Sequence, residues 1–435
     1  MNVGALLLAL PLLHGLLLTC YHLFLVPPTP SHLTGPVAVL PDLLTSEQAR
    51  SLRRLLREMG LSGLDSNLAD SKATLPEHEH VGEAEPIGPN GTCSHPFLVP
   101  SLNRTECVLA QRIDIGKHYL TTGGVYGLKD TYDVSIGRLQ SFGRYLFDLS
   151  EFPAVEELFG SRDFKEAAVG TCPAHKPLID PFQFNLIIQV PGQTVATHVD
   201  GVYFLGADRF RFPQWLLTAM QFSGLFADRF IDQIQIVAYF HEWEPSSRPD
   251  AKGEFIYYPN GTKGDVLRAD PTPRSGNAVD GSKVIHAAAP YYPGTLPPQL
   301  DKSKDNKLIF AGKGRWEIHS DRELVQAYKE DELRSTIVFR ARCFEDEEAM
   351  ARFKEKRPED KLELEDIIET LKKGMGGWVE EGASRLDLAL AILDHYVAYP
   401  PPEPRETLVP FNYCIVGKLF PPAKPLLKLA CTDFD

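Results

Sequence analysis

Three side chains that are far apart in the sequence have the types and surroundings of a metal site. His198 and Asp200 are separated by one residue in the segment ATHVDGVYF, which follows the apolar run NLIIQV and a Pro-Gly turn. Because alternate residues of a strand point to the same side, the imidazole and the carboxylate would be presented together. His286, in GNAVDGSKVIHAAAPY, shares the face of a second predicted strand with Val284. Two histidines and one carboxylate can bind Fe(II) on one face of an octahedron, which leaves three positions open for chemistry.

Simpler explanations exist for each of these histidines. A second His-x-Asp pair, His319 and Asp321, occurs in the same chain, and two such pairs are about what chance gives for 13 histidines. The second pair lies in the charged segment EIHSDREL, where we expect a helix to start, and only His395 follows it. A histidine on a buried strand, such as His286, is also often a hydrogen-bonded core residue. The metal site therefore needs support from another part of the sequence.

Two arginines provide that support. RSTIVFR places Arg334 and Arg340 six residues apart, so both would project from the same side of one strand. A buried guanidinium without a partner is very costly. Its planar fork binds a carboxylate through two parallel hydrogen bonds. A dicarboxylate cosubstrate would supply such a partner close to the metal.

The segments that carry these side chains read mainly as strands between Gly, Pro and Asp turns. The predicted strands are 37–40, 182–190, 234–240, 254–258, 283–288 and 334–344. A capping box at Thr45 to Gln48 predicts a helix that ends at Gly60. An apolar helix is expected over 212–230, as a lid or a packing helix. After residue 345 two amphipathic helices are expected, either as a brace packed on the body or as an interaction arm.

In this order the segments resemble the Fe(II)/2-oxoglutarate-dependent dioxygenases of the prolyl 4-hydroxylase-like type. The matching pieces are VAVLPDLLTSEQARSLRRLL, HVD, VAYFHEWEPSSRPDAKGEFIYYP, GNAVDGSKVIHAAAP and RSTIVFR, and they span about residues 36–345. The Arg-x5-Arg spacing is similar to that of the nucleic-acid alkylation-repair oxygenases, in which both arginines contact the cosubstrate. The long segment PGTLPPQLDKSKDNKLIFAGKGRW, between His286 and Arg334, is interpreted as an insertion.

The resemblance implies an α+β fold with a double-stranded β-helix core, jelly-roll or cupin-like, flanked by helices and followed by a C-terminal helical extension. It implies that His198, Asp200 and His286 hold Fe(II). The distal carboxylate of 2-oxoglutarate would bind Arg334, with Arg340 as a supporting or alternative partner. Ascorbate is a further candidate cofactor, and the expected reaction is hydroxylation of a C–H bond.

The N-terminus predicts a secretory-pathway protein. Residues 4–26 carry no formal charge and are long enough to cross a bilayer as a helix, before prolines that would end it. We expect a single-pass signal-anchor, with a cleaved signal and secretion as the alternative. Three Asn-x-Ser/Thr sequons, at Asn90, Asn103 and Asn260, and six cysteines beyond Cys20 fit a body in the endoplasmic reticulum or Golgi lumen. Cys93 and Cys107 are placed for a disulfide in a loop-rich segment.

Composition limits the function classes. With 43% hydrophobic and 24% charged residues the 435-residue chain is globular, and its formal charge of −13 argues against nucleic-acid binding. We expect an anchor and linker (1–35), a dioxygenase domain (36–345) and a helical extension (346–435). The expected substrate is a protein side chain of the prolyl or lysyl type. A lipid or other small-molecule substrate, and a non-catalytic binding module, are the alternatives; the oligomeric state is left open.

Overall fold

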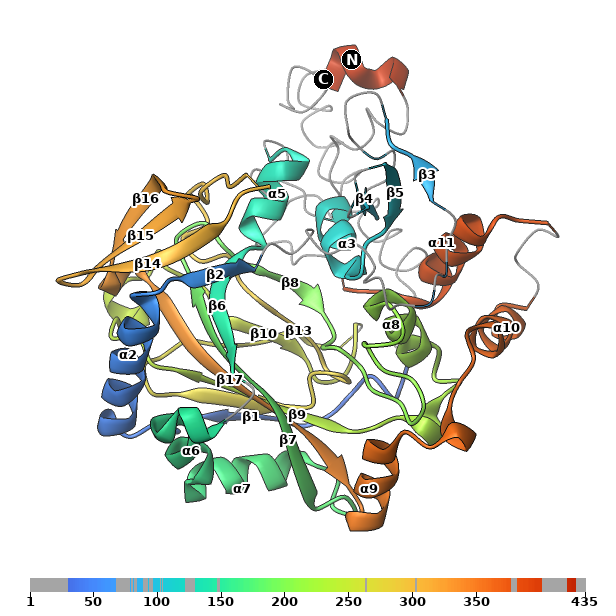
Figure 1. Cartoon of the computed structure of the whole chain (residues 1–435), viewed down its shortest axis with the longest axis horizontal. Helices are drawn as coiled ribbons and strands as arrows, with labels where there is room; N and C mark the ends of the chain where they lie inside the picture. The colour runs from blue at the N-terminus through green and yellow to red at the C-terminus, as the bar shows by residue number, and fades with distance from the viewer. Residues whose placement is uncertain are drawn as a thin grey trace, which may run out of the picture.

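A computed structural model describes residues 30–67, parts of 79–121, 130–146, 149–376 apart from 263 and 302, 382–400 and 421–427. Two antiparallel sheets face each other (Figure 1). The larger has ten strands in the order β1 (Val37–Leu40), β12 (Gly276–Val279), β9 (Gln233–Tyr239), β17 (Arg334–Phe344), β7 (Leu178–Gln189), β6 (Ser141–Leu146), β2 (Leu64–Asn67), β14 (Asn306–Gly312), β15 (Arg315–Ser320) and β16 (Glu323–Lys329). The smaller has β11 (Leu267–Ala269), β10 (Phe255–Tyr258), β13 (Ile285–Ala288) and β8 (Val195–His198).

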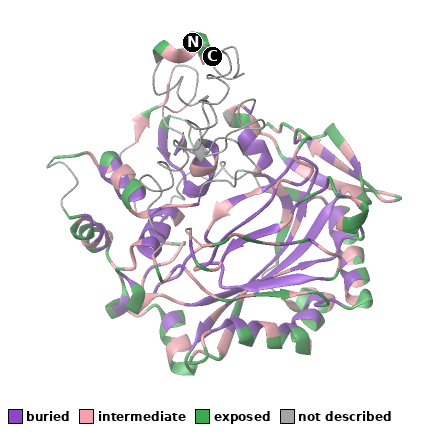
Figure 2. Ribbon diagram, turned by 180° about the vertical axis from the view of Figure 1, so that it is seen from behind, coloured by how far each residue is buried: buried purple, intermediate pink, exposed green. Residues whose placement is uncertain are grey.

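This architecture confirms the predicted α+β class with a jelly-roll-like pair of sheets, which stay two separate ladders and do not close into one barrel. β17 lies near the middle of the large sheet, between β7 and β9, and it has the bounds predicted from RSTIVFRARCF. Buried residues follow the strands of both sheets, whereas the outer sides of the helices are exposed (Figure 2). Side chains that point inward from β17 therefore meet those from β8 and β13.

Helices cover the outer face of the large sheet. α2 (Ser46–Gly60) begins at the predicted capping box, in which the Thr45 side chain accepts a hydrogen bond from the Gln48 backbone and the Gln48 side chain accepts one from the Thr45 backbone. Leu52 and Leu56 of α2 join the same core as β7, β9 and β17. α6 (Pro153–Gly160) and α7 (Arg162–Thr171) extend this layer, and Phe159 stacks on Phe184 of β7. Burial of each large apolar side chain contributes about 1.5–3 kcal/mol, so this layer fixes the sheet from behind.

Two predictions in this part of the chain are wrong. EIHSDREL is a strand hairpin of β15 and β16 instead of a helix start, and these strands extend the large sheet together with β14. The segment interpreted as an insertion contains β14 and the start of β15. The alternation in RWEIHS explains this, because Trp316 and Ile318 enter the core while His319 pairs with Glu317 on the other side. The apolar helix is also shorter than expected. α8 covers Gln214–Ser223 because Gly224 adopts a left-handed φ of 67° that ends it.

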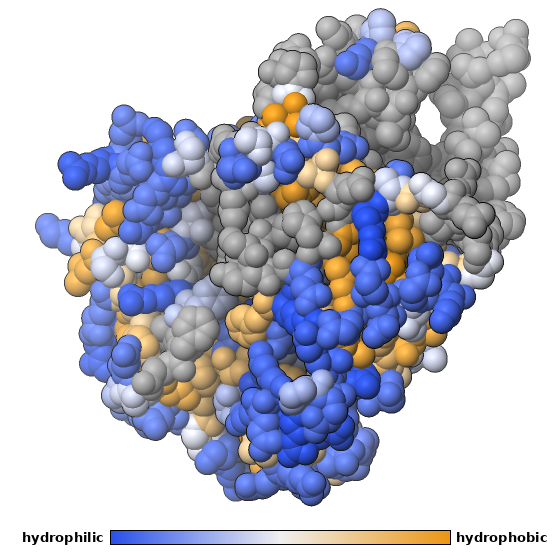
Figure 3. All heavy atoms as spheres, turned by 45° about the vertical axis from the view of Figure 1, so that its right-hand side comes forward, coloured by the Kyte–Doolittle hydropathy of each residue, from blue (hydrophilic) through white to orange (hydrophobic). Residues whose placement is uncertain are grey.

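The C-terminal helices pack on the body. α9 (Glu347–Glu355), α10 (Leu364–Gly374) and α11 (Arg385–Tyr396) follow β17, and a short α13 (Lys424–Leu427) comes last. Leu371 of α10 and Ile392 of α11 share one core with Trp215 and Leu216 of α8. On this side of the molecule hydrophilic surface alternates with hydrophobic areas (Figure 3). The described helices thus act as a brace, while the predicted domain boundaries at residues 35 and 345 stay predictions.

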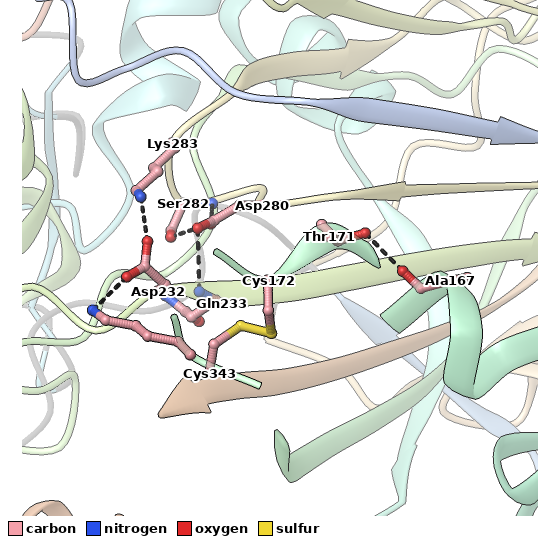
Figure 4. The surroundings of a disulfide bond; sticks show 10 residues. Ala167, Thr171, Cys172, Asp232, Gln233, Asp280, Ser282, Lys283 and Cys343 are labelled. Carbon is pink, nitrogen blue, oxygen red and sulfur yellow. Dashed lines mark hydrogen bonds and ion pairs between the residues drawn. A yellow bond between two sulfur atoms is a disulfide. The ribbon is translucent and has the colours of Figure 1, made fainter. Parts of the chain in front are cut away.

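A smaller third layer covers one end of the sheets. It contains the three-stranded sheet of β3 (Glu85–Pro86), β5 (Glu106–Leu109) and β4 (Leu98–Pro100), with α3 (Ile113–Thr121) and α5 (Tyr132–Arg138) beside it. The predicted disulfide Cys93–Cys107 forms here. A second disulfide, which was not predicted as a pair, joins Cys172 after α7 to Cys343 of β17 (Figure 4).

Several N- and C-terminal predictions lie outside the described residues, namely the anchor at 4–26, Asn90, Cys414 and Cys431. Among the residues that are described, no helix has the length and apolar character needed to cross a bilayer. Asn103 and Asn260 are described, and both are exposed.

Candidate metal centre

The structure brings together the three residues that the sequence singled out. His198 ends β8, His286 lies opposite it on β13, and the two imidazole rings have their centroids 4.4 Å apart. Asp200 lies two residues beyond the end of β8. His198, Asp200 and His286 each offer one ligand atom, and these atoms all lie within 4.8 Å of one another. Two neighbouring strands of the small sheet thus present all three groups at one point on its inner face.

Hydrogen bonds fix how the histidines would bind a cation. His198 Nδ1 lies 2.7 Å from the carbonyl oxygen of Ala196, and His286 Nδ1 lies 2.9 Å from that of Val284. In both rings Nδ1 therefore acts as the donor, and Nε2 is the nitrogen that would face a metal. Burial and the neighbouring His198 lower the pKa of His286 to about 4, so this ring is neutral at physiological pH. Neutral imidazoles are what a divalent metal requires.

The carboxylate of Asp200 completes the set. Its oxygens lie 3.6 Å from His198 Nε2 and 3.9 Å from His286 Nε2. Burial would raise the pKa of Asp200, but the positive charge of Arg340 beside it holds this pKa well below its usual range. Asp200 Oδ2 is buried without a hydrogen-bond partner among the described residues. A buried acceptor of this kind is costly unless a ligand satisfies it, and a cation at this point would do so.

Asp200 is held from two sides. Arg340 Nη2 binds its Oδ1, and the same guanidinium donates from Nε to Gln235 Oε1 at 2.9 Å. On the other side, the backbone N–H of Asp200 donates to the carbonyl oxygen of Gly281 at 2.7 Å. Gly281 leaves the space that the carboxylate fills, since a Cβ there would lie 2.9 Å from Asp200 Cγ and 3.1 Å from His286 Cε1. Only glycine allows this close approach without displacing a ligand.

The turn that contains Gly281 is itself anchored by buried polar contacts (Figure 4). Asp280 accepts hydrogen bonds from the backbone of Ser282 at 3.0 Å and from that of Gln233 at 3.2 Å. Next to it, Asp232 binds Lys283 and lies 2.6 Å from Lys176 Nζ. The backbone carbonyl of Asp232 also accepts from the N–H of Cys343, beside the disulfide. The ends of β9, β17 and the β12–β13 turn are thus tied together underneath the three candidate ligands.

The second arginine of β17 lies in a different environment. Arg334 is 5% exposed, and its guanidinium binds Gln189 Oε1 and lies 3.4 Å from the Tyr239 hydroxyl, with the Tyr239 ring 5.0 Å away. Its Nε has no partner, and within the described part of the chain no carboxylate pairs with it. Burial and the charge of Arg334 lower the pKa of the neighbouring His241 to about 3. The buried positive charge of Arg334 therefore lacks a counter-charge.

The structure therefore separates the roles of the two predicted arginines. Arg340 contacts the candidate ligand Asp200, whereas Arg334 lies six residues along the strand, about 20 Å away between Cα atoms at 3.3 Å per residue. Sequence reasoning missed Gln235, whose Nε2 lies 3.3 Å from His286 Nε2, and Gln189 beside Arg334. The only signal for them was the polar side chains that interrupt otherwise apolar strands. Among the aromatic residues of this region, Tyr239 contacts Arg334, while Tyr203 and Trp243 pack in separate clusters.

A cavity of about 200 Å³ opens beside His198, Asp200 and Arg340. Its walls come from the inner face of β7, from β8 and from residues around the start of α3 and the start of β6. His286 lies deeper and is 4% exposed. The candidate ligands are thus reached through this cavity from one end of the two sheets.

The chain matches no family model and no curated protein. Among solved structures, it is similar to a prolyl-4-hydroxylase of Pseudomonas putida at 11% identity, covering 46% of this chain and 71% of that one, with a TM-score of 0.23. HygX from Streptomyces hygroscopicus, solved with nickel, 2-oxoglutarate and hygromycin B, is 9% identical and covers 71% and 83%, with a TM-score of 0.30. The 2-oxoglutarate-dependent epimerase SnoN of nogalamycin biosynthesis is 8% identical and covers 72% and 79%, with a TM-score of 0.31. At such low identity and TM-scores, the chemistry of the site has to be inferred from its own residues.

Proposed function

We propose that this protein is an Fe(II)- and 2-oxoglutarate-dependent oxygenase that hydroxylates a C–H bond. The observation that carries the proposal is one arrangement of buried groups. Two imidazoles and an ionised carboxylate converge at one point, and a buried arginine without a counter-charge lies on the strand that also supplies the partner of that carboxylate. The two histidines and the carboxylate fit a divalent metal with open coordination positions. The unpaired arginine fits one carboxylate of a dicarboxylate.

His198, Asp200 and His286 would hold the metal. When bound, Fe(II) with 2-oxoglutarate would supply oxidative chemistry in which O2 and 2-oxoglutarate give succinate and CO2 while a substrate C–H group becomes C–OH. The protein contributes position and electrostatics. Arg340 keeps Asp200 ionised and oriented, and the Nδ1 hydrogen bonds of both histidines keep their Nε2 atoms turned toward the metal.

Arg334 is the proposed partner of the distal carboxylate of 2-oxoglutarate. Arg340 is already engaged by Asp200 and Gln235, whereas Arg334 has only the neutral partners Gln189 and Tyr239. A carboxylate at Arg334 would satisfy its Nε and offset a buried charge that otherwise costs several kcal/mol. Arg340 then has a supporting role, through the metal ligand.

We also propose that the reaction takes place in the lumen of the endoplasmic reticulum or Golgi, on a protein side chain, with the apolar N-terminal segment as a membrane anchor and ascorbate as a reductant. Two disulfides support an oxidising compartment, since such bonds are rare in the cytosol. The exposed sequons at Asn103 and Asn260 are accessible for glycosylation there. A glycosidase should then increase the gel mobility of the protein expressed in secretory cells, and unchanged mobility would contradict this location.

The oxygenase proposal is tested by adding Fe(II) and 2-oxoglutarate to the purified protein without oxygen. A visible charge-transfer absorption should appear, and admission of air should release succinate. His198→Ala should abolish both. The control is His319→Ala, which changes the other His-x-Asp pair, on the outward side of β15, and should leave both signals intact. Absence of the absorption and of succinate in the unaltered protein, or equal loss in both variants, would show that the site has another function.

A further inference from the structure

The cavity beside the candidate metal ligands contains polar groups that the proposed metal and cosubstrate sites do not use. Gln183 projects from β7 and is 2% exposed, and Gln140 lies just before β6 and is 3% exposed. Both side chains line the cavity together with His198 and Asp200. One lies on β7 and the other directly before its neighbour β6, so both face the same cavity as His198 of β8.

Each of these glutamines has an unsatisfied acceptor. Gln140 Oε1 and Gln183 Oε1 are buried without a hydrogen-bond partner in the part of the chain that is described. The amide of Gln183 is oriented by its own Nε2, which donates to Asn185 Oδ1 at 3.1 Å, so that its oxygen remains the free end. A buried acceptor without a donor costs about 1–3 kcal/mol, and a ligand that brings donors recovers this cost.

The charged side chains of the cavity are largely balanced. Arg112 binds Asp114 through two contacts, Nε–Oδ1 at 3.1 Å and Nη2–Oδ2 at 2.5 Å, and Arg340 binds Asp200. Two of the three arginines in the lining are therefore neutralised by aspartates of the same lining. Apart from Asp200, which the proposed metal would engage, the described lining has no carboxylate left to attract a cation. Its amides would be buried at a cost by an acyl chain.

We infer that the substrate of this site is a neutral polar group that carries at least two hydrogen-bond donors, either amide N–H or hydroxyl groups. This inference rests on the proposed function. The oxygens of Gln140 and Gln183 accept these donors and hold one C–H bond of the group toward the metal ligands. A volume of about 200 Å³ is below the range of about 300–1,000 Å³ usual for drug-sized ligands, so one residue-sized group enters.

The two sources of such donors are a peptide, whose backbone N–H groups flank a side chain, and a sugar ring. Three sets of probes distinguish them from each other and from a lipid. The sets are capped neutral tripeptides, methyl glycosides of common monosaccharides, and straight-chain fatty acids. The measurement is succinate release above the rate found with Fe(II) and 2-oxoglutarate alone. Stimulation is expected from the tripeptides or from the glycosides, and the active set identifies the source.

Variants test the role of the two amides. Gln183→Met and Gln140→Met keep the length of the side chain and remove the acceptor, so each should raise the KM for the active probe about three- to tenfold. The matched control is Gln326→Met on the exposed edge strand β16, which should leave the KM unchanged. Circular dichroism of each variant verifies the fold.

Stimulation by fatty acids alone, stimulation by neither donor-bearing set, or an unchanged KM in both cavity variants overturns the inference. These outcomes are distinct from failure of the oxygenase proposal, because the charge-transfer absorption and the unstimulated succinate release are measured on the unaltered protein without any probe. If those two signals are absent, the proposed function fails. If they are present and the probes fail, only the inferred substrate class is wrong.

Discussion

Replacement of Gly281 by alanine should weaken metal binding without changing any candidate ligand. Gly281 lies in the turn between β12 and β13, and its carbonyl accepts the backbone N–H of Asp200. An added Cβ would lie 2.9 Å from Asp200 Cγ and closer still to Oδ2, whereas real Cβ atoms essentially never come within 3.0 Å of another atom. The φ of Gly281 is not in the left-handed region, so alanine introduces a clash and no backbone strain.

The loss of metal affinity depends on how far the Asp200 carboxylate can move away from the added Cβ. The clashing atoms belong to a carboxylate that Arg340 and a backbone hydrogen bond hold in place. Overpacking of this kind costs about 1–3 kcal/mol. If this cost applies to the conformation that binds the metal, the dissociation constant for the metal rises about 5- to 150-fold. This range includes the 10–100-fold effect usual for residues that support metal ligands. At a metal concentration 100 times the dissociation constant, the metal stabilises the unaltered protein by about 2.7 kcal/mol, and a 30-fold weaker variant by about 0.9 kcal/mol.

The assay is a titration with Ni(II), which binds such sites without turning over, followed by thermal unfolding with and without the ion. Gly281→Ala should lose most of the metal-induced rise in Tm. The matched control is Gly201→Ala, next to Asp200, where an added Cβ meets nothing within 4 Å. It should retain the metal-induced rise. Equal metal affinity in Gly281→Ala and the unaltered protein, or equal weakening in both variants, would refute the steric argument and the assignment of Asp200 as a ligand.

Three further predictions concern the groups around the site. Arg334→Ala should raise the KM for 2-oxoglutarate about 10- to 100-fold, as expected for loss of a charge-assisted hydrogen bond, and an effect seen only in Arg340→Ala would reverse the assignment. Cys172→Ala should lower the free energy of unfolding by about 2–5 kcal/mol, measured by denaturant titration, because the disulfide closes a loop with a sequence separation of 171. Without metal, stability should fall between pH 6.5 and 4 by about 1.4 kcal/mol per pH unit for each of three histidines, His118, His241 and His286, measured as Tm against pH. In the folded state burial lowers the pKa of His118 and His286 to about 4 and that of His241 to about 3. As the pH falls, the unfolded chain therefore binds protons before the folded protein does. The raised pKa of Asp280, about 6 through burial, acts in the opposite direction and offsets part of this loss.

The parts of the site that the sequence predicted are those specified by short-range patterns. The alternation of strand residues places His198 and Asp200 together and makes Arg334 and Arg340 project from one side of β17, whatever lies around them. The capping box before α2 is likewise local. His286 was the one candidate ligand that needed a partner strand, and its prediction relied on the chemical requirement for a second imidazole.

The parts that the sequence did not predict depend on contacts between distant segments. The segments RWEIHS and ELVQAYK do not by themselves predict that β15 and β16 extend the large sheet. Their placement depends on the core that receives Trp316, which is built from β7, β9 and α2. The roles of Gly281 and Gln235 arise only when β12 pairs with β9 in one sheet and β13 pairs with β8 in the other. A glycine in a turn is common, and only the position of Asp200 shows why this one has no room for a side chain.

These distant contacts converge on Asp200, and they explain how its buried carboxylate stays ionised and is held in one orientation. Its carboxylate needs a positive partner to stay ionised in a buried place, and β17 provides Arg340. It needs a fixed backbone, and the β12–β13 turn provides the Gly281 carbonyl. That turn is connected through Lys283 to Asp232, and from there to the N–H of Cys343 beside the Cys172–Cys343 disulfide. Removal of the disulfide should therefore affect metal affinity as well as stability, since the same strand end carries both Arg340 and the bond. A disulfide variant that loses stability yet binds Ni(II) with unchanged affinity would show that the turn is fixed by its own hydrogen bonds to Asp280 and needs no help from the strand.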